Sequence, residues 1–255
     1  FRYRAVMKMD PKVFLPFIPE EKTRELIKRF EFTDASTLFL QVEGQGASAS
    51  PAACRNTGRM EMHDFKFTGV EFKSWTGDLE LFNHKKIFRD VTMIPREGFA
   101  HVKEVLMDDE TKTVRLTGVK GTADPVPLTG CFARKTAEAL VRYRFTPQTQ
   151  VEVDGLIDFT KRGPTERGLT DLQVKFTAPE GTATYPLWKR DYLIQAPSGL
   201  FTFKDRLMTY DVKGRLFGRA MTAQGTVQLI DKGGSYSVNL QAEEFRHVVL
   251  GKELI

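Results

Sequence analysis

Few residues in this sequence have the types and spacing that catalysis or metal binding requires. Its four histidines have no cysteine or acidic partner at the spacing of metal ligands: His63, His84, His101 and His247. The acidic run Asp108–Glu110 could supply carboxylates, for instance to an enzyme acting on polysaccharide. It lies where a hairpin must turn, so a solvated turn is the better interpretation. We predict no metal site, no cofactor and no enzymatic activity, since the GxGxxG, P-loop and GxSxG motifs are also absent.

The cysteines and tryptophans also have simple structural interpretations. Cys54 and Cys131 lie far apart and in no CxxC motif, so they could form one disulfide or stay free. We favour two small buried hydrophobic residues. Trp75 and Trp188 could contact lipid at a rim, but a tryptophan in a strand more often packs in a core.

The composition limits the class of protein. The chain has 255 residues, 41% of them hydrophobic, which suffices for a folded core and excludes a disordered chain. A net charge of +5 without a basic aromatic cluster does not indicate a nucleic-acid partner. No run of 18 apolar residues is present to span a bilayer as a helix. Because the sequence begins inside an expected strand, we expect it to be a fragment of a longer protein.

Apolar residues alternate with polar ones along most of the chain. Leu38, Leu40 and Val42 point one way, and Gln41 and Glu43 point the other, as in a half-buried strand. From residue 60 to 117 such strands follow one another with turn signals at hairpin spacing. The pattern predicts a mostly β fold built as a long antiparallel meander.

The pattern occurs twice. The helical segment 22–33 is echoed by 135–146 at a constant offset of 113 residues, which is 135 minus 22. The predicted hairpin Gly77–Val91 is echoed by Gly199–Val212. An array of units is therefore expected. Its predicted divisions are the end of a preceding repeat (1–9), a first repeat with a helix at about 20–30 (10–123), a second with a helix at about 134–143 (124–241) and the start of another (242–255).

Two short helices cannot cover the apolar face of so many strands. The sheet must curl so that this face lines either a closed core or an open trough, and alternation alone favours neither. A stack that extends by adding units favours the trough. We therefore predict an open β-groove, shaped like a taco, with one short helix per repeat.

Several landmarks occur along the expected strands. They are 64–72 (DFKFTGVEF), 77–81 (GDLEL), 90–91 (DV), 96–100 (REGFA), 114–116 (VRL) and 123–125 (ADP). Together they resemble the C-terminal region of the AsmA-like family, in the TamB and YhdP superfamily of bacterial envelope proteins. The resemblance covers nearly the whole chain and departs most over 172–196.

This resemblance implies a function without catalytic residues. It implies a periplasmic location, within an inner-membrane-anchored protein of a Gram-negative bacterium. It implies a groove that conducts phospholipid acyl chains between the inner and outer membranes, and so a role in lipid transport and outer-membrane biogenesis as an inter-membrane bridge. The alternative is a non-conducting periplasmic scaffold or regulator of outer-membrane assembly, with envelope proteins as partners.

The apolar residues of the alternating strands are the predicted lining of the groove. They are Leu40, Val42, Phe65, Phe67, Leu79, Leu81, Val91, Met93, Val114, Leu116, Val151, Val153, Leu172, Val174, Phe201, Phe203, Val212, Val227, Leu229, Val238 and Leu240. Their polar neighbours, such as Glu80 and Thr202, are predicted to face water.

Overall fold

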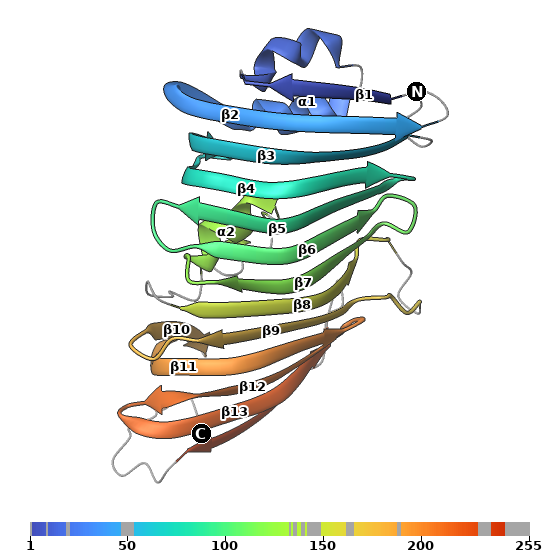
Figure 1. Ribbon diagram of the computed structural model, residues 1–255. Helices are drawn as coiled ribbons and strands as arrows, with labels where there is room; N and C mark the ends of the chain where they lie inside the picture. Colours follow the sequence, from blue (N-terminus) through green and yellow to red (C-terminus); the bar gives the residue numbers. More distant parts are fainter. Residues whose placement is uncertain are drawn as a thin grey trace.

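The chain forms one long antiparallel sheet of fourteen strands in a computed structural model (Figure 1). The structure describes residues 2–8, 10–18, 21–46, 54–132, 134, 137–138, 141, 149–161, 166–187, 190–228 and 236–242. The strands are β1 (Arg2–Met7), β2 (Phe30–Gly46), β3 (Cys54–Phe67), β4 (Val70–Phe82), β5 (Lys85–Pro95), β6 (Ala100–Asp108), β7 (Thr113–Gly121), β8 (Gln150–Asp158), β9 (Asp171–Thr177), β10 (Thr182–Leu187), β11 (Arg190–Lys204), β12 (Leu207–Leu216), β13 (Arg219–Gln228) and β14 (Tyr236–Ala242).

The sheet is a meander that does not close. Strands pair in chain order from β1 to β14, except that β9 pairs directly with β11, and β10 pairs with the first half of β11. No pairing joins β1 to β14 within the described residues. The predicted fold class, an open β-groove made from a long antiparallel meander, is confirmed.

Both predicted hairpins are present in this sheet. β4 and β5 turn at Asn83 and His84, and β11 and β12 turn at Asp205 and Arg206. Asn83, His84 and Asp205 adopt positive φ angles, as tight hairpin turns require. The division of the chain into repeats stays a prediction, and nearly all of its last segment, 242–255, lies outside the described residues.

The helices are short. The first predicted helix corresponds to α1 (Glu21–Lys28), which follows a 3-10 helix at Pro11–Phe17. Of the second, predicted at about 134–143, Arg134, Ala137 and Glu138 are helical, and several other residues lie outside the described part. A helix that the sequence did not predict, α2 (Pro125–Phe132), precedes it.

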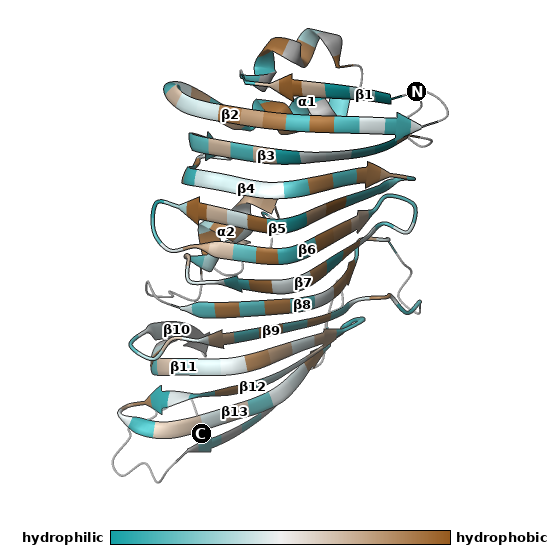
Figure 2. Cartoon of the chain, in the orientation of Figure 1, coloured by the Kyte–Doolittle hydropathy of each residue, from teal (hydrophilic) through white to brown (hydrophobic). Residues whose placement is uncertain are grey.

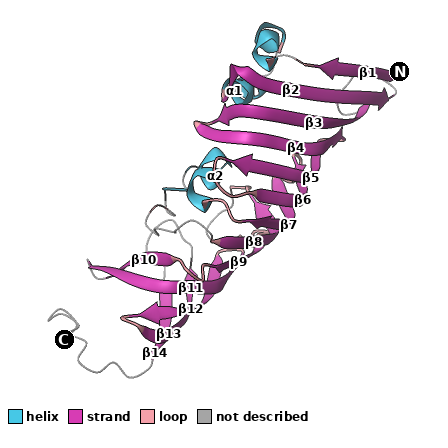
Figure 3. Cartoon of the chain, turned by 60° about the vertical axis from the view of Figure 1, so that its left-hand side comes forward, coloured by secondary structure: helices cyan, strands magenta, loops and turns pink. Residues whose placement is uncertain are grey.

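α2 covers part of one face of the sheet. It lies behind β5 and β6 in Figure 1 and to the left of the same strands in Figure 3. The Phe132 ring lies 6.1 Å from the rings of both Phe67 and Trp75, measured between centroids. The Cys131 thiol lies 3.6 Å from the Phe67 carbonyl oxygen. This packing stabilises a helix whose Gly and two Pro residues give it low intrinsic propensity.

The packed core lies beneath α2. Phe65, Phe67 and Phe72 are each only 2% exposed, and partly buried aromatic residues surround them. Phe65 and Phe72 are directly paired and stack at 5.5 Å. Aromatic pairs of this kind add about 0.5–1.5 kcal/mol beyond the burial of area. The core therefore occupies one end of β2–β6, and a smaller aromatic group of Phe176, Phe201 and Tyr210 lies on the same face in β9–β12.

Candidate functional site

The apolar face of the sheet is organised in rows that cross the strands. Directly paired residues of antiparallel strands point to the same face, so the register defines each row. A row that we call the third row is apolar or glycine from β1 to the end of the sheet. It comprises Ala5, Val42, Gly58, Leu79, Phe88, Val105, Leu116, Gly155, Leu172, Phe203, Met208, Val227 and, at the last register position, Tyr236.

Two further apolar rows lie beside it, nearer to α2. The second row comprises Met7, Leu40, Met60, Gly77, Val91, Val102, Val119, Val153, Val174, Phe201, Tyr210, Gly225 and Val238, with Val91 lying against Gly77 across a register shift. The first row, beside α2, comprises Leu38, Met62, Trp75, Met93, Ala100, Gly121, Val151, Phe176, Gly199, Val212, Ala223 and Leu240.

A fourth set of positions, the rim row, follows on the side away from α2. It comprises Tyr3, Gly44, Asn56, Leu81, Lys86, Met107, Val114 and Ile157. These four rows define the interior face, and Figure 2 shows the hydrophobic segments that they contribute along the strands. The opposite side is called the outer face.

Bulges keep the apolar residues on the interior face. Met62 and Phe65 are three residues apart, so strict alternation would place them on opposite faces. Asp64 lies between them with a positive φ angle of 50°, and β2 and β4 carry extra residues at the same level. Asp90, between Phe88 and Val91, also has a positive φ angle and is an extra residue of β5 at a register shift with β4. An extra residue restores the phase of the side chains, as bulges generally do.

The structure places the predicted lining residues together on this face. Each of them that lies in a described strand with a described side chain occupies one of the rows above or the aromatic core. Val238 and Leu240 hold register positions in β14, and Leu229 lies outside the described residues.

Four of those residues belong to the core and do not line an open surface. Phe65, Phe67, Val91 and Met93 are 8% exposed or less, because α2 and the aromatic cluster pack around them. Sequence alternation could not separate them from the others, since it marks a buried face whatever covers that face.

The rest of the interior face is only half-buried. From β6 to β13 the residues of the third row, including Val105, Leu116, Leu172 and Phe203, are all of intermediate exposure. On the α2 side, by contrast, Ala123, Thr149, Ala178 and Pro197 are buried. Apart from Gly77, Val91 and Val102 of the second row, which are buried, the second and third rows form a partly exposed apolar lane between a covered edge and an open one.

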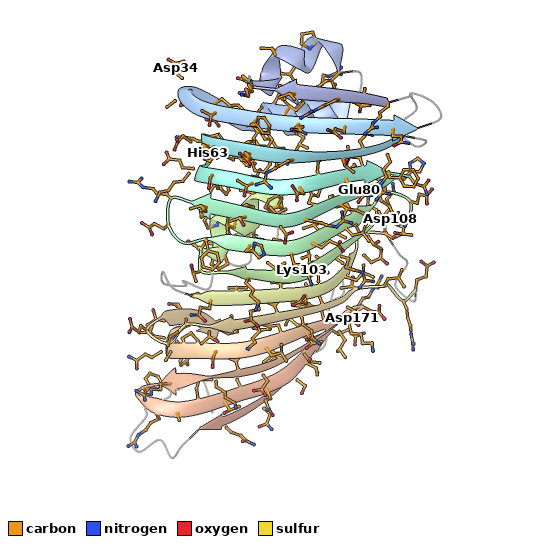
Figure 4. All side chains as sticks on the ribbon, viewed as in Figure 1. Asp34, His63, Glu80, Lys103, Asp108 and Asp171 are labelled. Carbon is orange, nitrogen blue, oxygen red and sulfur yellow. The ribbon has the colours of Figure 1, made fainter. Side chains whose placement is uncertain are left out.

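The outer face carries the charged residues. Arg55, Glu80, Arg89 and Glu104 alternate in sign across β3–β6, with Glu80 paired to both arginines. Figure 4 labels Glu80, Lys103 and Asp171 on three strands of this sheet. The prediction that Glu80 faces water was wrong, because Arg55 and Arg89 leave its side chain only 10% exposed. Hydrogen bonding from Arg89 holds the pKa of Glu80 below its usual value, with a smaller contribution from Arg55.

The described residues that were considered first for chemistry do not form a metal site, and His247 lies outside the described residues. Within the described residues, no group of three His, Cys, Asp or Glu side chains is placed to hold a metal ion. Asp108 accepts hydrogen bonds from the backbone N–H groups of Glu110 and Thr111, as expected for a turn. Cys54 and Cys131 are free and buried. Trp75 packs against Phe67, and Trp188 lies outside the described residues.

The helices of the described residues include none long and apolar enough to cross a membrane. No protein-family model, no curated protein and no solved structure matches this chain.

Proposed function

We propose that this chain binds the acyl chains of phospholipids along the lane formed by the second and third rows. In this proposal it is a segment of an AsmA-like protein of the bacterial periplasm that conducts lipid between the inner and outer membranes. The observation that carries the proposal is the third row, which is apolar or glycine on every strand it crosses and half-buried over β6–β13.

The shape of the lane suits an acyl chain. Thirteen strands on the pairing path, spaced about 4.8 Å apart, give it a length of roughly 55–60 Å. An acyl chain spans about 15 Å, half of a bilayer core of about 30 Å, so the lane is long enough for several chains in sequence. Covering this face with lipid removes apolar area from water, which contributes about 25 cal/mol per Å².

The arrangement also keeps a charged headgroup in water. The lane is bordered by a covered edge on the α2 side and, on the other, by the rim row, most of whose residues are at least partly exposed. An acyl chain can therefore lie on apolar side chains while its headgroup stays outside, which avoids the large cost of burying an unpaired charge.

Photo-crosslinking tests the proposal with matched positions on the two faces. A photoreactive amino acid at Leu116 or Phe203, in the third row, should capture phospholipid in bacterial cells. The same group at Arg115 or Thr202, one residue away on the outer face, should not. Equal capture at both kinds of position, or none at Leu116 and Phe203, would refute lipid binding and favour a non-conducting scaffold.

A further inference from the structure

The two edges of the apolar lane differ in a way that concerns the lipid headgroup. The α2 edge is covered by packed side chains, among them Cys131 at 3% and Ala178 at 2% exposure. The other edge carries the short turns between β4 and β5, β6 and β7, and β11 and β12, together with the longer connection between β8 and β9. A headgroup leaves the lane at this second edge, because the first offers it no access to water.

Lys86 stands at that edge with its side chain on the interior face. It pairs with Leu81 on one side and with Met107 on the other, and it lies two residues from Phe88 of the third row. Of the described residues in the four interior rows, Lys86 alone carries a charge. A spacing of two residues along a strand is about 7 Å, within reach of a flexible lysine side chain.

Lys86 forms an exposed ion pair with a neighbouring turn. Its ammonium nitrogen lies 2.8 Å from the Asp109 carboxylate, and both side chains are 46% exposed. An exposed ion pair of this kind is weak, because water screens both charges. The ammonium can therefore exchange this carboxylate for another anion at little cost.

We propose that Lys86 binds the phosphate of the phospholipid whose acyl chains occupy the lane, a role that rests on the proposed function. The phosphate is the charged group nearest to the acyl chains in such a lipid. The Lys86 ammonium lies at the open edge of the lane, so it would contact the phosphate of a lipid whose acyl chains lie on the third row. The charge-assisted hydrogen bond would orient each lipid with its headgroup toward the open edge.

Lys85 provides a matched control. It is adjacent in sequence, 45% exposed, and also paired with a carboxylate, Asp108, at 3.9 Å. Its side chain points to the outer face, since neighbouring residues of a strand point to opposite sides. Lys85→Ala and Lys86→Ala therefore remove the same charge from the same hairpin and differ in the face affected.

Binding of two probes to the 255-residue chain tests the proposal. The probes are dioleoylphosphatidylglycerol and dioleoylglycerol, which share their acyl chains and differ in the phosphate-containing headgroup. Lys86→Ala should weaken binding of the phospholipid about two- to fivefold and leave the neutral lipid unchanged. Lys85→Ala should change neither, and inorganic phosphate alone should show no binding that depends on Lys86.

The failures of the two proposals are distinguishable. If the unaltered chain binds both lipids and Lys86→Ala affects them equally, the role of Lys86 is refuted while lipid binding stands. The role of Lys86 is also refuted if Lys85→Ala reproduces the effect, or if inorganic phosphate binds through Lys86 without acyl chains. If the unaltered chain binds neither lipid, the proposed function fails and the role of Lys86 fails with it.

Discussion

The Arg89 guanidinium on β5 donates a hydrogen bond of 2.8 Å to the Glu80 carboxylate on β4, on the outer face of the sheet. Arg55 on β3 approaches the other carboxylate oxygen at 2.5 Å, so one acidic side chain joins three adjacent strands. At 10% exposure, Glu80 is the least exposed charged side chain among the ion pairs of the described residues. The network therefore links β3, β4 and β5 on the face opposite the apolar lane.

Replacing Glu80 should therefore cost more than replacing an exposed acid. Glu80→Gln should lower the free energy of unfolding by about 1–3 kcal/mol, because it weakens two charge-assisted hydrogen bonds near a buried position. Glu61→Gln, which affects an exposed pair with Arg59, should cost less than about 1 kcal/mol. Urea unfolding of both variants at neutral pH measures the difference, and equal losses would contradict this view of Glu80.

The same network predicts a dependence on pH. The pKa of Glu80 is lowered in the folded state from a usual value of 4.5, chiefly by Arg89. Its contribution to stability is therefore complete above pH 4.5 and is lost as the pH falls through the lowered pKa. Unfolding midpoints measured from about pH 6 to about pH 3 should fall less in Glu80→Gln than in the unaltered chain. If the unfolding midpoints of both proteins fell equally with pH, other groups would be responsible for the loss of stability in acid.

The core and the lane should respond differently to truncation. Phe72 is 2% exposed and lies in the aromatic cluster, so Phe72→Ala should cost about 3–5 kcal/mol. Leu116 is half-buried in the third row, so Leu116→Ala should cost no more than about 2 kcal/mol. Denaturant unfolding tests both. If Leu116→Ala lowered the free energy of unfolding as much as Phe72→Ala, the lane would be a closed core and not an open surface.

Alternation predicted the interior face well because it depends on the pleat of the strand alone. Residues such as Leu79, Leu116 and Phe203 needed only a period of two to be assigned to one face. Placing Met62 and Phe65 on the same face required a bulge at Asp64, which no pattern in the sequence predicts. The burial of Glu80 required two arginines from neighbouring strands, and single-strand patterns contain no such pairing.

The division of this face into core and lane could not be predicted from the sequence, for a different reason. It depends on α2, whose residues Pro125 to Phe132 contain two prolines and a glycine and therefore have a low helix propensity. The helix is held by tertiary contacts of Cys131 and Phe132 with β3 and β4. Local helix propensity predicts little where tertiary packing determines the conformation, as it does for α2.

The burial of Cys131 between α2 and β3 also predicts an unreactive thiol. Desolvation raises the pKa of the Cys131 thiol from 9.0 to about 11. The thiolate needed for alkylation is therefore scarce in the folded chain at about pH 8, and iodoacetamide should label Cys131 only after unfolding. The stability associated with this thiol is complete below pH 9.0 and declines as the pH rises toward about 11. Rapid labelling of the native protein, with the site identified by mass spectrometry, would contradict the packing of α2 on β3.

Two turn glycines offer a final comparison, because they share a backbone conformation and differ in surroundings. Gly98 between β5 and β6 and Gly218 between β12 and β13 both have a φ angle of +75°. A Cβ atom at Gly98 would lie 2.6 Å from the Ala123 Cα, whereas a Cβ at Gly218 would meet nothing within 4 Å. Gly218→Ala should therefore cost only the backbone strain, about 1–2 kcal/mol. Gly98→Ala must in addition displace the backbone that leads into α2, so its unfolding midpoint should fall clearly further. Equal shifts in the two variants would show that Ala123 is free to move and that the approach of this turn to α2 does not constrain the covered edge of the groove.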